Sequence, residues 1–187
     1  MSETAFTHLE TERLRLRRFD DSDLAPFLAY LNDPEVARYQ TWESYTEQGA
    51  RDVIERQKNL SPGVPGQWFT FAVELKETGQ LAGHVALKTE ADARQAEIGF
   101  TFAREYHGRG LAFEAAARVL EYVFHDLALH RVTAVTDCEN HRSAALLGRL
   151  GMRREGHFIR NVWFKGKWGD EYLYAVLREE WRRVRAG

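Results

Sequence analysis

The chain has 187 residues, a formal net charge of −2 and 29% charged residues, an ordinary composition for a globular protein. This length predicts one domain, residues 1–187. The nearly balanced charge gives no indication of direct nucleic-acid binding, and no apolar run is long enough to cross a membrane. The one cysteine, Cys138, excludes an intramolecular disulfide and a two-thiol metal site, and no secretory signal is visible, so we expect a cytoplasmic protein.

Hydrophobic periodicity predicts the elements of the N-terminal half. Leu14 and Leu16 alternate with arginines, which predicts a first strand over residues 13–19. Apolar residues at helical spacing predict one helix within residues 20–33 and a second over 46–60. After a loop rich in proline and glycine, aromatic and β-branched residues with period two predict three strands, at 68–75, 81–88 and 96–102.

The C-terminal half has no proline and predicts longer elements. A long helix is expected over about 108–127, a short buried strand over 131–137, and a helix over 140–150 that starts at Asn140 and ends before Gly151. Residues 157–164 and 171–177 flank a tight turn and predict a hairpin. The order βααβββαβαββ predicts an α/β fold with about six or seven strands and about four helices.

The segment between residues 96 and 116 carries the clearest chemical signal. A predicted strand leads into a glycine-containing loop, residues 107–112, which opens the long helix. Gly108 and Gly110 let the backbone approach a ligand closely, and free amides at a helix start favour an anion such as pyrophosphate. Phe113 stands where a dinucleotide-binding fingerprint needs a small residue, and no P-loop sequence follows. Taken alone, the loop could equally be a helix-entry turn.

The loop resembles the acyl-CoA pyrophosphate loop of the GCN5-related N-acetyltransferase (GNAT) superfamily, Gln/Arg-x-x-Gly-x-Gly/Ala. Here it reads His107-x-x-Gly110-x-Ala112, with histidine at the first position. Residues 136–156 are similar to the family's later Asn-x-x-Ser…Leu-Gly-Phe segment, with Met152 for the usual phenylalanine. Together with EIGF at residues 97–100, these motifs most closely resemble the ribosomal-protein N-terminal acetyltransferase (Rim-type) branch. A looser likeness extends from residue 11 to residue 181.

This resemblance implies a GNAT fold with a mixed, mostly antiparallel sheet. It also implies direct transfer of an acetyl group from acetyl-CoA to an amine in a ternary complex, without a metal. In the family, the strand before the loop pairs through its backbone with pantetheine, and the loop amides bind pyrophosphate. Asn140 would cap its helix and also reach the pantetheine. The implied cosubstrate-binding residues are Phe100, Thr101, Phe102, His107, Gly108, Arg109, Gly110, Leu111, Ala112, Asn140 and Ser143.

Glu97 and Ser143 are the candidate catalytic residues. Gly99 follows closely after Glu97, and a glycine within a strand often marks a bulge. A bulge would splay the sheet and aim Glu97 at the reaction site as a general base, although this carboxylate could instead form an exposed ion pair. Ser143 could protonate the departing thiolate or bond only its local backbone. The alternative acids are Tyr106, Tyr172 and Tyr174.

The acceptor amine is less defined. An α-amine has a pKa near ~7.8 and a lysine amine near ~10.4, so the α-amine costs about 3.5 kcal/mol less to deprotonate. This difference and the branch resemblance favour a protein or peptide N-terminus, such as that of a ribosomal protein. The alternatives are a small amine (polyamine or antibiotic) as acceptor, or a catalytically silent CoA-binding module.

Three further residues are candidates for acceptor binding. Trp42 could wall the acceptor pocket or simply pack, and His84 could line it or lie in the core or at the surface. Asp170 could meet an ammonium group or serve the hairpin turn. No histidine spacing indicates a metal site. The sequence leaves a monomer and a homodimer equally open.

Overall fold

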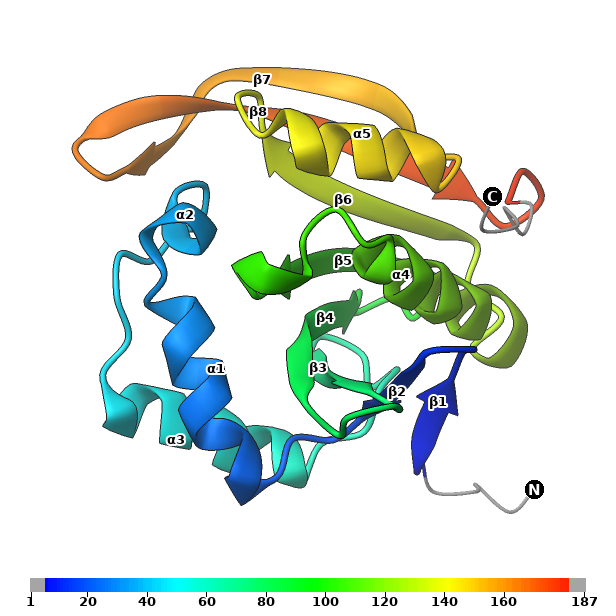
Figure 1. Cartoon of the computed structure of the whole chain (residues 1–187). Helices are drawn as coiled ribbons and strands as arrows, with labels where there is room; N and C mark the ends of the chain where they lie inside the picture. The colour runs from blue at the N-terminus through cyan, green and yellow to red at the C-terminus, as the bar shows by residue number, and fades with distance from the viewer. Residues whose placement is uncertain (1–5, 182–187) are drawn as a thin grey trace.

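Within residues 6–181 the chain forms one eight-stranded sheet in the order β1-β2-β3-β4-β5-β6-β8-β7 (Figure 1). The computed structural model describes these residues, and residues 1–5 and 182–187 of the predicted domain lie outside them. Neighbouring strands are antiparallel except β5 and β6, so the predicted mixed, mostly antiparallel α/β fold is confirmed. The strands are β1 (His8–Glu10), β2 (Leu14–Arg17), β3 (Trp68–Leu75), β4 (Leu81–Thr89), β5 (Gln95–Phe102), β6 (Arg131–Asp137), β7 (Arg153–Phe164) and β8 (Lys167–Leu177).

The predicted number of strands, six or seven, is too low. The expected first strand over residues 13–19 is the second strand of a hairpin, in which Leu9 of β1 lies opposite Leu16 of β2. β1 has three residues, which is too short for an alternating pattern to show in the sequence. The two leucines are nevertheless buried, so this edge strand extends the core.

Five α-helices accompany the sheet in the described part of the chain, one more than predicted. The extra helix is α2, a single turn that begins at Pro34 and is capped by Asp33, whose side chain accepts a hydrogen bond from the Glu35 N–H at 2.9 Å. The long helix expected over residues 108–127 is shorter, because the glycine loop precedes it and a π-helical segment, Tyr122–Asp126, follows it. The helices are α1 (Leu24–Leu31), α2 (Pro34–Ala37), α3 (Glu47–Lys58), α4 (Leu111–Glu121) and α5 (His141–Arg149).

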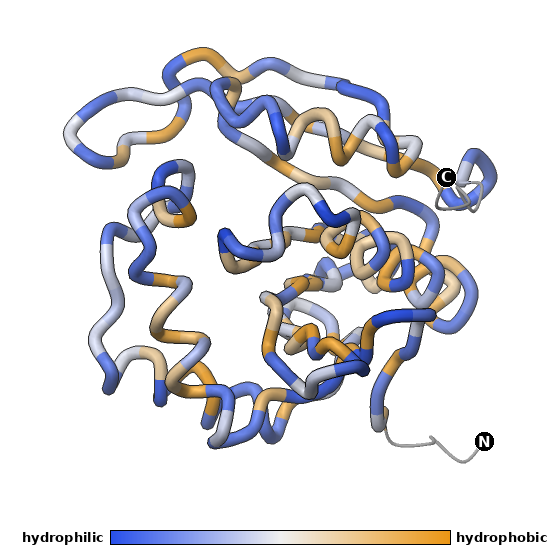
Figure 2. Tube along the Cα trace, viewed as in Figure 1, coloured by the Kyte–Doolittle hydropathy of each residue, from blue (hydrophilic) through white to orange (hydrophobic). Residues whose placement is uncertain are grey.

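Helices lie on both faces of the central strands. On one face of β4, His84 packs against Phe27 of α1 with ring centroids 5.9 Å apart. Val85, the next residue, lies opposite Phe71 of β3, and Phe71 contacts Tyr122 just beyond α4. Because successive residues of a strand point to opposite faces, α1 and α4 lie on opposite sides of the sheet. Hydrophobic positions dominate both helices (Figure 2), and in α4 hydrophilic positions interrupt them, as expected of a helix that buries one side.

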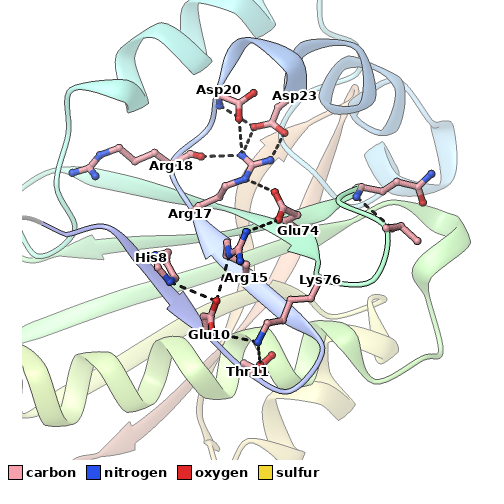
Figure 3. Close-up of polar contacts among 12 residues, drawn as sticks. His8, Glu10, Thr11, Arg15, Arg17, Arg18, Asp20, Asp23, Glu74 and Lys76 are labelled. Carbon is pink, nitrogen blue, oxygen red and sulfur yellow. Dashed lines mark hydrogen bonds and ion pairs between the residues drawn. The ribbon is translucent and has the colours of Figure 1, made fainter.

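Arg17, at the end of β2, ties the sheet to the start of α1 (Figure 3). Its guanidinium donates to both carboxylate oxygens of Asp23, at 2.6 and 2.9 Å, and to Glu74 of β3 at 2.7 Å. Asp23 is buried and also accepts the Asp20 N–H at 2.9 Å. The hydrogen bonds with Asp23 raise the pKa of Arg17, so its guanidinium stays charged. Because α1 leads directly into α2, this network helps to fix the orientation of both helices.

We expect Asp23→Asn to lower the free energy of unfolding by about 3 kcal/mol, because it leaves the Arg17 charge without its buried partner. Urea denaturation followed by circular dichroism measures this change. Arg15→Gln is the control, since Arg15 forms ion pairs of 3.4 Å with Glu10 and Glu74 at the surface. It should cost less than about 1 kcal/mol. Equal losses in the two variants would contradict the anchoring role of Asp23.

Candidate active site

β5 and β6 are hydrogen-bonded neighbours over only a short stretch. Their parallel pairing starts at Gln95 opposite Arg131 and ends at Glu97 opposite Thr133. Both strands continue beyond this point, and a cleft of about 1010 Å³ lies between residues 98–102 of β5 and residues 134–137 of β6. The sheet therefore opens as a V with Glu97 at its vertex.

The predicted bulge at Gly99 is wrong, although the predicted opening of the sheet exists. β4 and β5 pair without a shift of register from Gly83 opposite Phe102 to Thr89 opposite Ala96. Gly99 lies within this regular stretch. The sheet opens on the other edge of β5, where pairing with β6 stops, so no irregularity of β5 itself is needed.

Gly83 lets β4 approach the cleft wall closely. A Cβ atom at this position would lie 2.3 Å from the Thr101 carbonyl oxygen and 2.7 Å from the Phe102 Cα. Both are backbone atoms and cannot rotate away as a flexible side chain would. Thr101 and Phe102 line the cleft, so the packing at Gly83 fixes where their backbone groups lie.

The glycine loop, residues 107–112, forms one end of the cleft. Gly108 and Gly110 have φ angles of 75° and 77°, in the left-handed region that strains other residues, and Gly110 caps α4. The Arg109 guanidinium turns to the Tyr106 ring, 5.5 Å from its centroid. The free amides and the dipole at the start of α4 make this end suitable for an anion. The other five loop residues line the cleft: His107, Gly108, Gly110, Leu111 and Ala112.

Asn140 begins α5, as predicted. Its Oδ1 accepts the Ser143 N–H at 3.1 Å, so the predicted helix cap is confirmed. Asn140 and Ser143 both line the cleft. Arg149, in the last turn of α5, also lines it and stacks over the Phe113 ring of α4 at 4.7 Å. The cleft therefore lies between the N-terminus of α4 and one side of α5 along its length.

Glu97 lies just below the cleft, because the lining of β5 begins at the next residue, Ile98. The side chain is partly buried, and burial raises the pKa of Glu97 above its ordinary value. Lys88, opposite Glu97 on β4, acts against this shift, whereas the negative charges of Glu90 and Glu171 add to it. A carboxylate with a raised pKa is better matched to accepting a proton near neutral pH.

The four candidate acids differ in their position relative to the cleft and in the contacts of their hydroxyl groups. Ser143 and Tyr106 line the cleft, but the Tyr106 hydroxyl donates to Gln80 Oε1 at 3.1 Å. Tyr172 is covered by the Arg154 guanidinium, 4.5 Å from its ring centroid, and lies outside the lining, as does Tyr174. Ser143 is therefore the candidate acid that combines a place in the cleft with no other observed role for its hydroxyl among residues 6–181.

The three candidate acceptor-binding residues lie outside the cleft lining. The His84 Nδ1 is 2.8 Å from the Tyr30 hydroxyl, and burial lowers the pKa of His84 to about 4. Trp42 donates its indole N–H to the Leu31 carbonyl at 3.1 Å. Asp170 accepts the Arg160 N–H at 2.8 Å, in the irregular part of β7. Each side chain thus has a structural contact of its own.

The hairpin was expected from the sequence, but α2, which forms a wall of the cleft together with it, was not. The hairpin reaches α2 at its tip (Figure 1), where the Lys165 ammonium donates to the Ala37 and Arg38 carbonyl oxygens. The Asp-Pro pair at residues 33 and 34 is an N-terminal helix signal that could have revealed α2. No local pattern could have placed the hairpin against it. Lining residues on this wall are Glu35, Val36, Arg38, Tyr39, Gln40, Thr41, Val162, Phe164 and Glu171.

Comparison with known proteins identifies the family. The profile of the acetyltransferase (GNAT) domain matches residues 13–153. The chain belongs to the GNAT family. It is 34% identical over 174 residues to "Uncharacterized N-acetyltransferase YnaD" of Bacillus subtilis (strain 168), which covers 93% of this chain and 99% of that protein.

Two further likenesses concern the fold and a distant relative. The crystal structure of a GNAT-family acetyltransferase from Bacillus anthracis superposes with a TM-score of 0.85 at 32% identity, over 93% of this chain and 100% of that one. A shorter match, 32% identical over 84 residues, is to the "[Ribosomal protein uS5]-alanine N-acetyltransferase" of Escherichia coli (strain K12). It covers 45% of this chain and 43% of that protein.

As a GNAT member, the protein is an acetyl-CoA-dependent N-acetyltransferase. The cleft fits such a cosubstrate, because it joins a helix N-terminus suited to pyrophosphate with a strand edge free to pair with an extended arm. Within residues 6–181 no three or more His, Cys, Asp or Glu side chains are grouped to hold a metal ion. In the same part of the chain, no helix has the length and apolar character needed to span a membrane.

We expect Gly83→Ala to destabilise the protein by roughly 2 kcal/mol, because its Cβ would overlap the backbone of β5. Thermal or urea denaturation measures the loss. Gly148→Ala makes the same change in α5, where a Cβ meets no atom within 4 Å, and should be neutral or slightly stabilising. If both variants were as stable as the wild type, β4 would not constrain the cleft wall in the way described.

Proposed function

We propose that the protein acetylates the N-terminal α-amine of a protein or peptide, in the manner of the Rim-type branch that its motifs resemble. The observation that carries this proposal is the continuity of the cleft. It runs from the loop at the start of α4, along the edge of β5 released from β6, to the vertex at Glu97. An acyl-CoA bound along this path would present its thioester near Glu97.

The β5 edge supports the placement of the pantetheine arm. Phe100, Thr101 and Phe102 line the cleft, where β6 no longer serves as a pairing partner. The Thr101 carbonyl faces Gly83 of β4 and the Phe102 carbonyl is 2.8 Å from His107 Nε2, so the free edge is left with the Phe100 backbone groups and the Phe102 N–H. Pairing with the amides of an extended arm would satisfy these groups as an added strand does. The pyrophosphate then lies at residues 107–112, and Asn140 faces the arm from α5.

The transfer requires two proton movements. The amine nitrogen attacks the thioester carbonyl carbon, a C–N bond forms and the C–S bond breaks, the nitrogen loses a proton and the thiolate gains one. Glu97 accepts the amine proton through a bridging water, because it lies below the cleft wall. Ser143 supplies the proton to the thiolate, and Tyr39, which also lines the cleft, is an alternative donor.

Two observations favour a chain terminus as the acceptor. The bond from Lys165 to the end of α2 joins the two parts of the wall on the proposed acceptor side, and such a wall favours the flexible end of a chain over a side chain on a folded surface. An α-amine also needs less assistance from a single carboxylate than lysine does. The similarity to the ribosomal protein uS5-alanine acetyltransferase, although it covers 45% of this chain, agrees with this choice.

Glu97→Gln should lower kcat roughly 100-fold or more, because the amide cannot accept the amine proton. Since burial raises the pKa of Glu97, wild-type turnover should fall as the pH drops through that raised value. This acidic limb of the pH profile should be missing from the residual activity of the variant. Steady-state kinetics from about pH 5 to 9 measures both effects.

Binding and stability serve as controls for this variant. The affinity for CoA, measured by calorimetry, should be unchanged. A raised pKa means that ionising Glu97 costs folding stability once the pH exceeds its unfolded-state pKa, so Glu97→Gln should be at least as stable at pH 7. Turnover within twofold of the wild type would exclude Glu97 as the base.

The acceptor class can be tested by release of CoA from acetyl-CoA with a panel of amines. We expect turnover with peptides that have a free N-terminus, and little with Nα-acetylated peptides that contain lysine. Preference for a polyamine or an amine-bearing antibiotic would instead establish a small-molecule acceptor. Tight binding of acetyl-CoA with no turnover across the panel would indicate a silent CoA-binding module.

A further inference from the structure

Arg13, at the start of β2, contacts the loop that precedes α4. Its Nη1 donates to the Arg109 carbonyl oxygen at 3.0 Å, and its Nε donates to Glu114 Oε2 at 2.7 Å. The Glu114 carboxylate also accepts the Arg13 backbone N–H at 3.0 Å and the Thr11 hydroxyl at 2.5 Å. The Glu114 side chain is 12% exposed, so the Arg13 guanidinium forms an ion pair with a largely buried carboxylate in the first turn of α4.

The bond to Arg109 controls the direction of the next N–H group. In a trans peptide the carbonyl of one residue and the N–H of the next point in opposite directions. Gly110 lines the cleft, whereas Arg109 and Arg13 do not, so the Arg109 carbonyl is held on the side away from the cleft. The Gly110 N–H, which residues 6–181 leave without a hydrogen-bond acceptor, therefore points into the cleft.

The same guanidinium compensates the charge of Glu114. Burial acts to raise the pKa of Glu114, but hydrogen bonds from Thr11 and Arg13 outweigh it and lower the pKa, so the carboxylate is ionised. An uncompensated carboxylate in the first turn of α4 would repel an anion bound at the helix N-terminus. The ion pair with Arg13, 2.6 Å between Nη2 and Oε2, opposes this repulsion.

We infer that Arg13 is a positioning residue for CoA, which presents the Gly110 N–H to the pyrophosphate and neutralises Glu114 without touching the cosubstrate. This role rests on the proposed placement of the pyrophosphate at residues 107–112, and it is independent of the acceptor. The loop motif does not contain Arg13, which precedes Arg109 by 96 positions.

The test compares CoA with pantetheine, which lacks the pyrophosphate and nucleotide, in calorimetric binding to the wild type and Arg13→Gln. The variant should bind CoA roughly tenfold more weakly and pantetheine as the wild type does. With an amine that the wild type acetylates, KM for acetyl-CoA should rise while kcat stays within twofold. A general loss of structure would reduce pantetheine binding and kcat as well.

Arg15→Gln is the matched control. Arg15 lies two positions after Arg13. Its side chain is 45% exposed, against 46% for Arg13, but it forms ion pairs with Glu10 and Glu74 and has no bond to the loop. Its affinity for CoA should equal that of the wild type. Arg13→Lys retains the charge but cannot span both acceptors, so its affinity should lie between those of Arg13→Gln and the wild type.

The outcomes separate this inference from the proposed site. If the wild type bound CoA no better than pantetheine, the pyrophosphate would not lie at the loop, and both proposals would fail. If the wild type preferred CoA and Arg13→Gln kept the same preference, the positioning role alone would be overturned. Wild-type affinity in Arg13→Lys would show that charge suffices, which also contradicts positioning of the Gly110 peptide.

Discussion

Hydrogen bonding between β5 and β6 stops at Glu97 and Thr133, and the site depends on this early end of the pairing. Both strands run on, so their facing edges border a cleft, while their other edges stay paired with β4 and β8. Unpaired backbone groups need a partner, and an extended amide-containing arm can provide one. Continuous pairing with β4, with Gly83 at the closest approach, keeps the released edge of β5 in one position. The opening is therefore a rigid slot, built from regular strand structure.

Charged side chains from the first strands fix the two ends of this slot. Arg17 binds buried Asp23 and so holds the start of α1, which leads into the α2 wall. Arg13 binds Glu114 and the Arg109 carbonyl and so holds the loop at the start of α4. Arg17 ends the short strand β2 and Arg13 directly precedes it, and the two arginines act on opposite sides of the cleft. The β1–β2 hairpin thus links the cosubstrate end of the cleft to the acceptor end.

The side of the cleft proposed for the acceptor is constructed differently from the side proposed for acetyl-CoA. Its wall consists of a single-turn helix and the tip of a hairpin, which meet through the Lys165 ammonium and two carbonyl groups of α2. Charges of both signs face the cleft there, among them Glu35, Arg38 and Glu171. Side chains of such a wall can be substituted without disturbing the sheet, whereas substitutions that move the edge of β5 would disturb it. This difference agrees with a family that shares one cosubstrate site and varies in its acceptors.

Features that depend on neighbours a few residues apart could be predicted from the sequence. Periodicity located most strands and helices, glycine spacing located the loop at residues 107–112, and a cap residue located the start of α5 at Asn140. These features together were enough for the α/β fold and the family. The three-residue β1 and the single-turn α2 were missed because such short segments contain no full period.

The way distant segments meet follows from the packing of the folded chain. Glu97 lies at the vertex of the V with no bulge at Gly99, and His84 is enclosed against Tyr30, outside the cleft lining. The same packing brings Lys165 to Ala37, 128 positions earlier, and Arg13 to the loop. Contacts between residues so far apart leave no periodic pattern in a single chain, because they follow from how the sheet and helices pack. The anion-binding character of the loop could thus be predicted from neighbouring residues. The shape of the proposed acceptor side and the contact of Arg13 with the loop could not.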